Sequence, residues 1–204
     1  MQPYRLKRTV LPTAEPVTAF AAMEHLRTDS GVEENYISGL ITVAREWCET
    51  YTQSTLMTST WQLTLDRFPE APVAKRGRVN LPEIALPRGP VQSVSSIVYL
   101  DEDNASQTLS ASVYTVDTAS GSVARVVPAY DQEWPDTIDH INAVTVTYIA
   151  GYTAAALVPS HFVHAIKLLV GHWYENRESV GSVGKEIELT VHSLLAPYRL
   201  GTVG

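Results

Sequence analysis

The spacing of apolar residues along the chain changes twice, and each change predicts a change of secondary structure. Between residues 32 and 53 apolar side chains recur at steps of three and four, which places them on one stripe of a helix of about four turns. This stripe consists of Ile37, Leu40, Ile41, Ala44, Trp47, Cys48 and Tyr51. A shorter helix is expected before it, capped by Thr18 and running to about Arg27.

From residue 60 the period becomes two, which is typical of a strand with one buried face. The run "TWQLTLDR" places Trp61, Leu63 and Leu65 on one face and polar side chains on the other. Further runs with the composition of strands lie at 93–100, 112–116, 122–127 and 143–151, with turn-rich stretches between them. This spacing predicts an antiparallel meander.

A proline-rich segment, residues 69–90, interrupts the predicted strands. Its sequence "PEAPVAKRGRVNLPEIALPRGP" contains five prolines and no clear period. We expect an extended excursion whose basic tip, "KRGR", is a solvated loop, because four residues are too few for a nucleic-acid patch.

Helical spacing returns after Pro159, with Ser160 as the expected cap and a helix to about Glu178. The sequence "SVGSVG" ends that helix, and a last helix is expected at 186–196, terminated at Pro197. Because helices come from both ends of the chain, the predicted fold class is α+β. It is a small helical bundle of N- and C-terminal helices with an inserted antiparallel β-rich lobe.

The expected boundaries follow from these elements. Residues 1–17 form an N-terminal arm, residues 18–58 and 159–204 the helical bundle, and residues 59–151 the β-rich insertion. The arm is interrupted by prolines and carries Arg5, Lys7 and Arg8, so it is expected to become ordered only on a partner surface.

Composition narrows the classes of function. A chain of 204 residues with 45% hydrophobic residues can bury a core in one domain or in a domain with an insertion. The net charge of -7 argues against tight, sequence-independent binding of phosphates. The single cysteine, Cys48, cannot form an internal disulfide and fits a reducing compartment. No apolar run approaches the roughly 20 residues that cross a bilayer, so neither a membrane segment nor an export signal is predicted.

The expected helix at 161–178 contains three of the six histidines, which raises the question of a metal site. His161 and His164 are three residues apart, and His172 and Glu175 repeat that spacing. The two pairs are separated by about 16 Å, too far to share one ion, and solvated or interface histidines are the alternative. The packing arc of this helix comprises Phe162, Ile166, Leu169, Val170 and Trp173, whereas Lys167 and Glu178 lie opposite with His161 and His164.

The sequence contains no motif for nucleophilic catalysis or nucleotide binding. There is no G-x-S-x-G elbow, no glycine-rich phosphate loop and no cysteine–histidine pattern. The acidic run Asp101, Glu102 and Asp103 is expected to be a solvated hairpin turn. No catalytic, cofactor-binding or metal-binding residue is therefore predicted, and no cofactor. Tyr174, Arg177 and Glu178 are residue types found in a subunit contact as readily as in an internal salt bridge.

The order of several segments resembles the head-tail connector (adaptor, or head-completion) proteins of long-tailed bacteriophages and prophages. The resemblance spans about residues 16–200, and its strongest parts are the run at 173–178 and the closing "LLAPYR". The longer basic N-terminal arm departs from that pattern. The segments are "PVTAFAAMEHLRTD", "AREWCETYTQSTLMTSTWQLTLDRFP", "VNLPEIALPRGPVQSVSSIVYLDED", "YTVD", "VTVTYIAGY", "VPSHFVHAIKLLVGHWYENRE" and "LLAPYR".

This resemblance implies a non-enzymatic virion protein at the head–tail interface, made in the cytoplasm of the bacterial host. It implies a ring, commonly of twelve copies, that binds the portal protein and seats a stopper or tail-side connector protein. Genomic DNA would pass through without sequence-specific binding, and no membrane is involved. By position, the resemblance assigns the portal contact to Pro197, Tyr198, Arg199 and Leu200.

Three alternatives stay open at this point. A stopper or tail-terminator subunit of the same stack is usually smaller and dominated by β structure, whereas this chain has four expected helices. A small metal-dependent hydrolase would use His161, His164, His172 and Glu175. A DNA-binding connector would use "KRGR" and the N-terminal arm.

Overall fold

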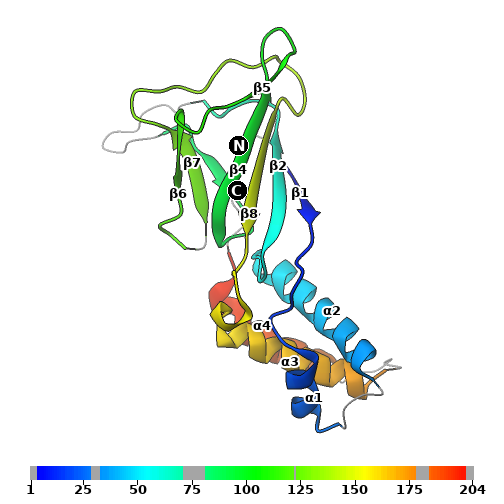
Figure 1. The fold of residues 1–204 in the computed structure, drawn as a ribbon. Coiled ribbons are helices and arrows are strands. Elements are labelled where there is room, and N and C mark those ends of the chain that lie inside the picture. The colour runs from blue at the N-terminus through cyan, green and yellow to red at the C-terminus, as the bar shows by residue number, and fades with distance from the viewer. Residues whose placement is uncertain (1–3, 29–32, 71–80, 122, 178–183, 201–204) are drawn as a thin grey trace. The chain divides into compact units, whose positions relative to one another are not determined.

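The computed structural model describes residues 4–28, 33–70, 81–121, 123–177 and 184–200. They form two compact units (Figure 1). The β unit comprises residues 4–11 and 58–151, and the helical unit comprises residues 12–57 and 152–200. The predicted α+β class is confirmed, since N- and C-terminal helices pack together and the antiparallel sheets are formed largely by the sequence between them. None of the described helices is both long enough and apolar enough to span a membrane.

The helical unit contains four α-helices and two short 3-10 turns among its described residues. In it α3 packs against α1, α2 and α4, and α1 also packs against α2. The Thr18 hydroxyl accepts a hydrogen bond of 3.1 Å from the backbone N–H of Ala21, so the predicted N-cap of the first helix is confirmed. The elements are α1 (Ala19–Leu26), α2 (Glu34–Thr52), η1 (Ala155–Leu157), α3 (Ser160–Glu175), α4 (Gly184–Leu195) and η2 (Ala196–Tyr198).

The core of the helical unit is built from the apolar stripes read in the sequence. The buried members on α2 and α3 are Ile37, Ile41, Ala44, Cys48, Phe162, Ile166, Leu169 and Val170. Trp47, Tyr51 and Trp173 are only partly buried and lie at the margin of this cluster. These three aromatic side chains therefore form the edge of the core.

The third helix departs from its predicted ends. Its N-cap is Pro159 and no side chain caps it, so the prediction of Ser160 as the cap is wrong. The helix ends at Glu175 and not near Glu178. Both the backbone N–H and the side-chain amide of Asn176 donate to the carbonyl of His172, at 3.0 and 2.8 Å. The backbone bond is the last i→i−4 bond of the helix, whereas the side-chain bond to the same carbonyl is the local alternative that favours an end at this position.

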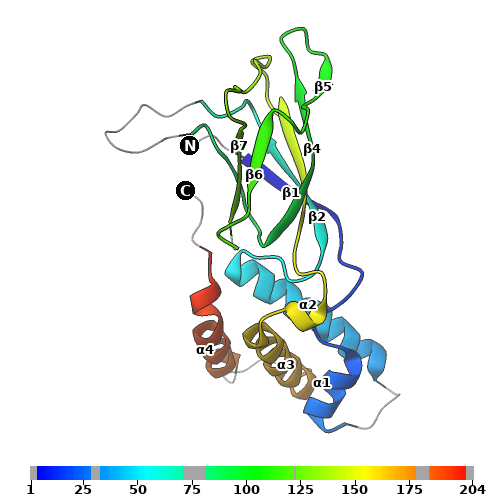
Figure 2. The same cartoon turned by 60° about the vertical axis from the view of Figure 1, so that its left-hand side comes forward.

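The β unit consists of two antiparallel sheets (Figure 2). The five-stranded sheet has the order β1-β2-β8-β4-β5 and the three-stranded sheet the order β3-β7-β6. The strands are β1 (Tyr4–Val10), β2 (Ser59–Leu65), β3 (Ile84–Leu86), β4 (Val91–Leu100), β5 (Ser106–Thr108), β6 (Tyr114–Asp117), β7 (Ala124–Pro128) and β8 (Val144–Ala150).

The predicted meander is wrong, because strands distant in the sequence pair with one another. Strand β2 lies between β1 and β8, and Leu63 is opposite Val146. The alternation predicted for β2 is confirmed, since Trp61, Leu63 and Leu65 are buried. Both sheets contribute to one apolar core, which covers the inner face of each.

Residues 4–10 are not an arm that waits for a partner. They form β1, which pairs with β2 from Tyr4 opposite Leu65 to Arg8 opposite Trp61. The Arg8 guanidinium lies 4.6 Å from the centre of the Trp61 ring, so its positive charge is stacked on an aromatic face. The basic residues that suggested an arm are those that natural proteins place on edge strands.

Part of the proline-rich segment and the acidic run belong to the β unit. Residues 84–86 of the expected excursion form β3, with Ile84 and Leu86 buried, whereas "KRGR" at 75–78 lies outside the described residues. The acidic run 101–103 does lie in the turn of a hairpin between β4 and β5. One oxygen of Asp101 accepts hydrogen bonds from the backbone N–H groups of Asp103 and Ala105, at 3.1 and 2.8 Å.

Candidate interaction surfaces

An exposed cluster of aromatic and charged side chains lies where α2 begins and α3 ends. The Tyr174 hydroxyl donates to one carboxylate oxygen of Glu33, and the Arg177 guanidinium donates to the other. The same guanidinium lies 4.7 Å from the ring centre of Tyr36 and 4.9 Å from that of Tyr174. The hydrogen bond from Tyr174, followed by that from Arg177, lowers the pKa of Glu33.

Two of the three predicted subunit-contact residues belong to this cluster. Tyr174 and Arg177 are engaged within the chain, while Glu178 lies outside the described residues. The Arg177 side chain is nevertheless 47% exposed and Tyr36 is 38% exposed. An arginine held between two tyrosines at the surface has the composition of an interface anchor. Contact with another subunit stays a prediction.

The predicted portal segment is held against the helical unit by its apolar and aromatic members. The Tyr198 hydroxyl lies 2.9 Å from Nδ1 of His161, and the Tyr198 ring packs on Phe162 with 5.2 Å between ring centres. The Leu200 backbone N–H donates to the Thr52 carbonyl at 3.0 Å. Pro197 and Arg199 are exposed. The segment therefore presents these two side chains from a fixed framework.

A stack of three rings fastens α4 to α2. The rings of Tyr51 and His192 lie 4.5 Å apart and almost parallel, and Trp47 stacks on Tyr51 at 5.5 Å. The Tyr51 hydroxyl also donates to the His192 carbonyl at 3.3 Å. The Arg199 guanidinium also lies over the Tyr51 ring, 5.6 Å from its centre. The stack thus connects the framework of the C-terminal turn to α2.

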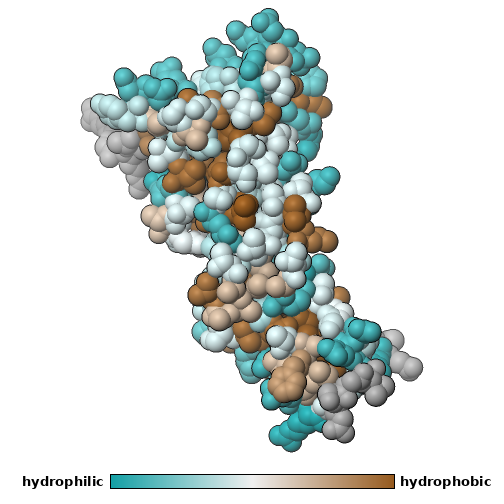
Figure 3. Space-filling model, viewed as in Figure 1, coloured by the Kyte–Doolittle hydropathy of each residue, from teal (hydrophilic) through white to brown (hydrophobic). Residues whose placement is uncertain are grey.

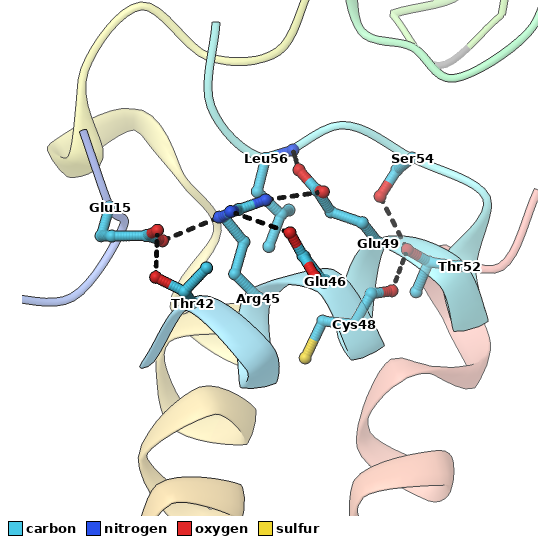
Figure 4. Close-up of polar contacts among 9 residues, drawn as sticks. All are labelled: Glu15, Thr42, Arg45, Glu46, Cys48, Glu49, Thr52, Ser54 and Leu56. Carbon is cyan, nitrogen blue, oxygen red and sulfur yellow. Dashed lines mark hydrogen bonds and ion pairs between the residues drawn. The ribbon is translucent and has the colours of Figure 1, made fainter. Parts of the chain in front are cut away.

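A buried network of charges is centred on Arg45 of α2 (Figure 4). Its guanidinium donates to Glu15 at 2.8 Å and to Glu49 at 3.0 Å, and the side chains of Arg45 and Glu49 are each 3% exposed. The second oxygen of Glu49 accepts from the Leu56 backbone N–H at 2.8 Å. Burial alone would lower the pKa of Arg45, but the Glu15 hydrogen bond and the neighbouring carboxylates outweigh it and raise the pKa.

Sequence reasoning missed this network. Arg45 and Glu49 lie four residues apart and directly follow Ala44 and Cys48 of the buried stripe, which is the signal that was available. Glu15 gave no signal, because it lies in the segment that was expected to be an arm. Its role depends on a contact across 30 residues of sequence.

The histidines of α3 occupy separate settings. His161 contacts Tyr198, Nδ1 of His172 lies 3.2 Å from the side-chain amide of Asn176, and His164 is exposed. Within the described ranges no three histidine, cysteine, aspartate or glutamate side chains lie close enough together to hold a metal ion. Burial raises the pKa of the Cys48 thiol to about 12, so this thiol is held in its unreactive, protonated form.

The β unit contains an open groove of about 810 Å³ between the segment after β2 and the loop between β7 and β8. Phe68 and Trp134 stack along it with 4.9 Å between ring centres, and the Trp134 indole N–H donates to the Pro82 carbonyl at 2.8 Å. Its lining includes the acidic residues Glu70, Asp131, Glu133 and Asp136. Sequence reasoning did not identify this groove, whose walls come from segments read as loops.

Comparison with known proteins gives matches at the level of structure alone. No protein-family profile matches the chain. No curated protein sequence matches it either.

Three of the structural matches are chains of gene transfer agent particles, each 17% identical to this chain. Each match covers 98% of this chain and 97% of the other. The TM-score is 0.74 for the neck of an empty particle computed with C6 symmetry, 0.72 for the virion of the native particle, and 0.66 for the neck of the native particle computed with C12 symmetry. At this identity the likeness establishes a shared fold over nearly the whole chain.

Proposed function

We propose that this chain is a structural, non-enzymatic subunit of the neck of a phage-like particle, at the head–tail interface of the virion. The observation that carries the proposal is the match to a neck chain over 98% of this chain and 97% of the other, with a TM-score of 0.74. The sequence resemblance to head-tail connector proteins supports the same role independently, because it rests on short segments and not on the fold.

The subunit assembles into a ring with copies of itself. Neck structures computed with C6 and C12 symmetry support this arrangement, and the sequence resemblance favours twelve copies. A closed ring of identical subunits brings two different faces of each subunit together. The surface cluster of Tyr36, Tyr174 and Arg177 offers one anchor for such a contact.

Within the neck we assign the adaptor position, in which the ring binds the portal protein, extends the DNA channel and seats the next connector or tail protein. The portal contact is made by Pro197, Tyr198, Arg199 and Leu200. In support, Pro197 and Arg199 are exposed on a turn that Tyr198 and Leu200 hold in place. The net charge of -7 suits a channel wall that lets DNA pass without binding it.

The adaptor and stopper positions differ in their order of assembly, and this difference provides the test. Purified protein should bind the portal protein in a pull-down that contains no other neck protein. It should also restore tail attachment to heads that were assembled without it. A stopper would bind only after another neck protein had been added. Failure to bind portal and failure to restore tails would together overturn the proposed function.

A further inference from the structure

Opposite edges of the five-stranded sheet carry opposite charges. Strand β1 is one edge of the sheet and β5 is the other. Residues 1–14, which include β1, contain basic residues and no carboxylate side chain. Residues 89–124, which include β4, β5 and the turn between them, contain acidic residues and no lysine or arginine. The sheet therefore has a basic edge and an acidic edge within one compact unit.

The basic edge carries two side chains on the outer face of the sheet. Arg5 and Lys7 are opposite Thr64 and Gln62 of β2, the face turned away from the core. Both are exposed, and neither forms an ion pair with a described residue; Arg5 donates to the side-chain oxygen of Asn142. Their positive charges are therefore available to a partner.

The acidic edge carries its two carboxylates in the turn that joins β4 to β5, because β5 itself (Ser106–Thr108) has no charged side chain. Asp101 uses its oxygens to hold the turn through hydrogen bonds with Asp103, Ala105 and Gln107. Glu102 and Asp103 are exposed and form no ion pair with a described residue. Hydrophilic residues cover this turn at the end of the β unit in Figure 3. The turn is thus held by these hydrogen bonds and carries two available negative charges.

Both edges also carry open backbone. Among the described residues β1 pairs only with β2, and β5 pairs only with β4. Charges on an edge strand keep like edges apart and so prevent uncontrolled pairing. Edges of opposite sign attract each other, and the same charges then select a basic-to-acidic contact between copies.

We propose that the β1 edge of one copy docks beside the β4–β5 edge of the next copy, with Arg5 and Lys7 facing Glu102 and Asp103. The contact uses two different faces, as a ring of identical subunits requires. In the sheet, Tyr4 lies in the same row as Leu65, Val144 and Tyr99, and the turn begins two residues after Tyr99. Strand β1 runs antiparallel to β4, so Arg5 and Lys7 lie level with Val98 and Ser96, on the other side of this row from the turn. The contact therefore needs a displacement of about five or six residues along the strands, roughly 18 Å at about 3.3 Å per residue, to bring the two charge pairs together. This inference rests on the proposed ring and names the surfaces that build it.

Charge reversal tests the contact. The variants Arg5→Glu/Lys7→Glu and Glu102→Lys/Asp103→Lys should each weaken self-association about tenfold or more, because each places like charges across the contact. A one-to-one mixture of the two variants should restore association, since every junction then has opposite charges. A matched control for the basic pair, Arg67→Glu/Lys167→Glu, makes the same change of net charge without touching either edge. Sedimentation equilibrium at low and high salt measures all four samples.

Cross-linking provides a second readout that does not depend on a stable ring. In the pair variant Lys7→Cys/Asp103→Cys, mild oxidation of a concentrated solution should give a ladder of linked chains, because each chain can bond at two edges. Either single variant should stop at dimers, and the pair Lys7→Cys/His164→Cys should give no ladder.

The outcomes separate this inference from the proposed function. Rings that survive both charge reversals, with no ladder from the edge pair, would overturn the edge contact and leave the ring standing. Absence of any self-association, free or on the portal, would overturn both. Loss with each reversal and recovery in the mixture supports the edge contact.

Discussion

Arg45 and Glu49 lie one helical turn apart in α2 and form a 3.0 Å ion pair that is almost fully excluded from solvent. Taking two charges out of water is costly, so such a pair contributes little net stability by itself. Removing one partner is different, because the other charge is left buried and uncompensated. Through Glu15 and Leu56 this pair also holds the segments that precede α1 and follow α2.

Replacing the arginine of this pair should therefore destabilise the protein strongly. We expect Arg45→Met to lower the free energy of unfolding by about 3 kcal/mol, because Glu49 and Glu15 lose their buried countercharge. Adding Glu49→Gln to that variant should recover part of the loss, since the amide oxygen can still accept from Leu56. Urea unfolding measures both values. A loss below about 1 kcal/mol for Arg45→Met would show that the network is open to water.

The Glu33 cluster should make stability depend on pH at the acid end. The pKa of Glu33 is lowered in the folded chain. The stability that Glu33 contributes is therefore present above its unfolded pKa of about 4.5 and is lost as the pH falls through its folded pKa. The variant Glu33→Gln should therefore show a shallower loss of stability below pH 4.5 than the parent. The control Glu34→Gln removes the neighbouring carboxylate and leaves the contacts of Glu33 with Tyr174 and Arg177 in place. Equal slopes for Glu33→Gln and the parent would contradict the contacts of Glu33 with Tyr174 and Arg177.

The single cysteine should report unfolding. Cys48 is buried and its pKa is raised to about 12, so the native protein contains almost no thiolate at neutral pH. We expect an aromatic disulfide reagent to label the native protein slowly and the denatured protein at once. The rate of labelling of the native protein should increase with denaturant concentration. Rapid stoichiometric labelling in native buffer would show that the α2–α3 core is not closed around this residue.

The C-terminal turn should separate folding from portal binding. Arg199 is exposed, so Arg199→Glu should leave the unfolding midpoint nearly unchanged and weaken binding to the portal protein about tenfold. Tyr198→Ala should reduce both, because the Tyr198 ring packs on Phe162 and its hydroxyl contacts His161. Lys167→Glu on α3 is the charge-matched control. Unchanged portal binding by Arg199→Glu would remove this residue from the proposed contact.

The parts of the fold that local spacing encodes were predictable. The stripe of Ile37, Ile41, Ala44 and Cys48 and the alternation of Trp61, Leu63 and Leu65 each repeat with the period of their element, so a short window of sequence is sufficient. Strand β3 was not predictable in this way, because three residues are too few to show a period and its partner β7 lies about 40 residues further on.

The candidate surfaces depend even more on long-range contacts. Tyr174 and Arg177 were identifiable as interface residue types, but their shared partner Glu33 lies more than 140 residues earlier. Arg5 and Lys7 resembled a free arm until their strand was seen to pair with β2. Prolines and charges mark a segment as irregular, yet an edge strand has the same composition.

Electron microscopy of the protein mixed with the portal protein, with no other neck component present, tests the central claim most directly. A ring-forming adaptor predicts an added annular layer on one end of the portal, with the symmetry of a closed ring of this chain. Portal particles that look the same with and without an excess of the protein would contradict it.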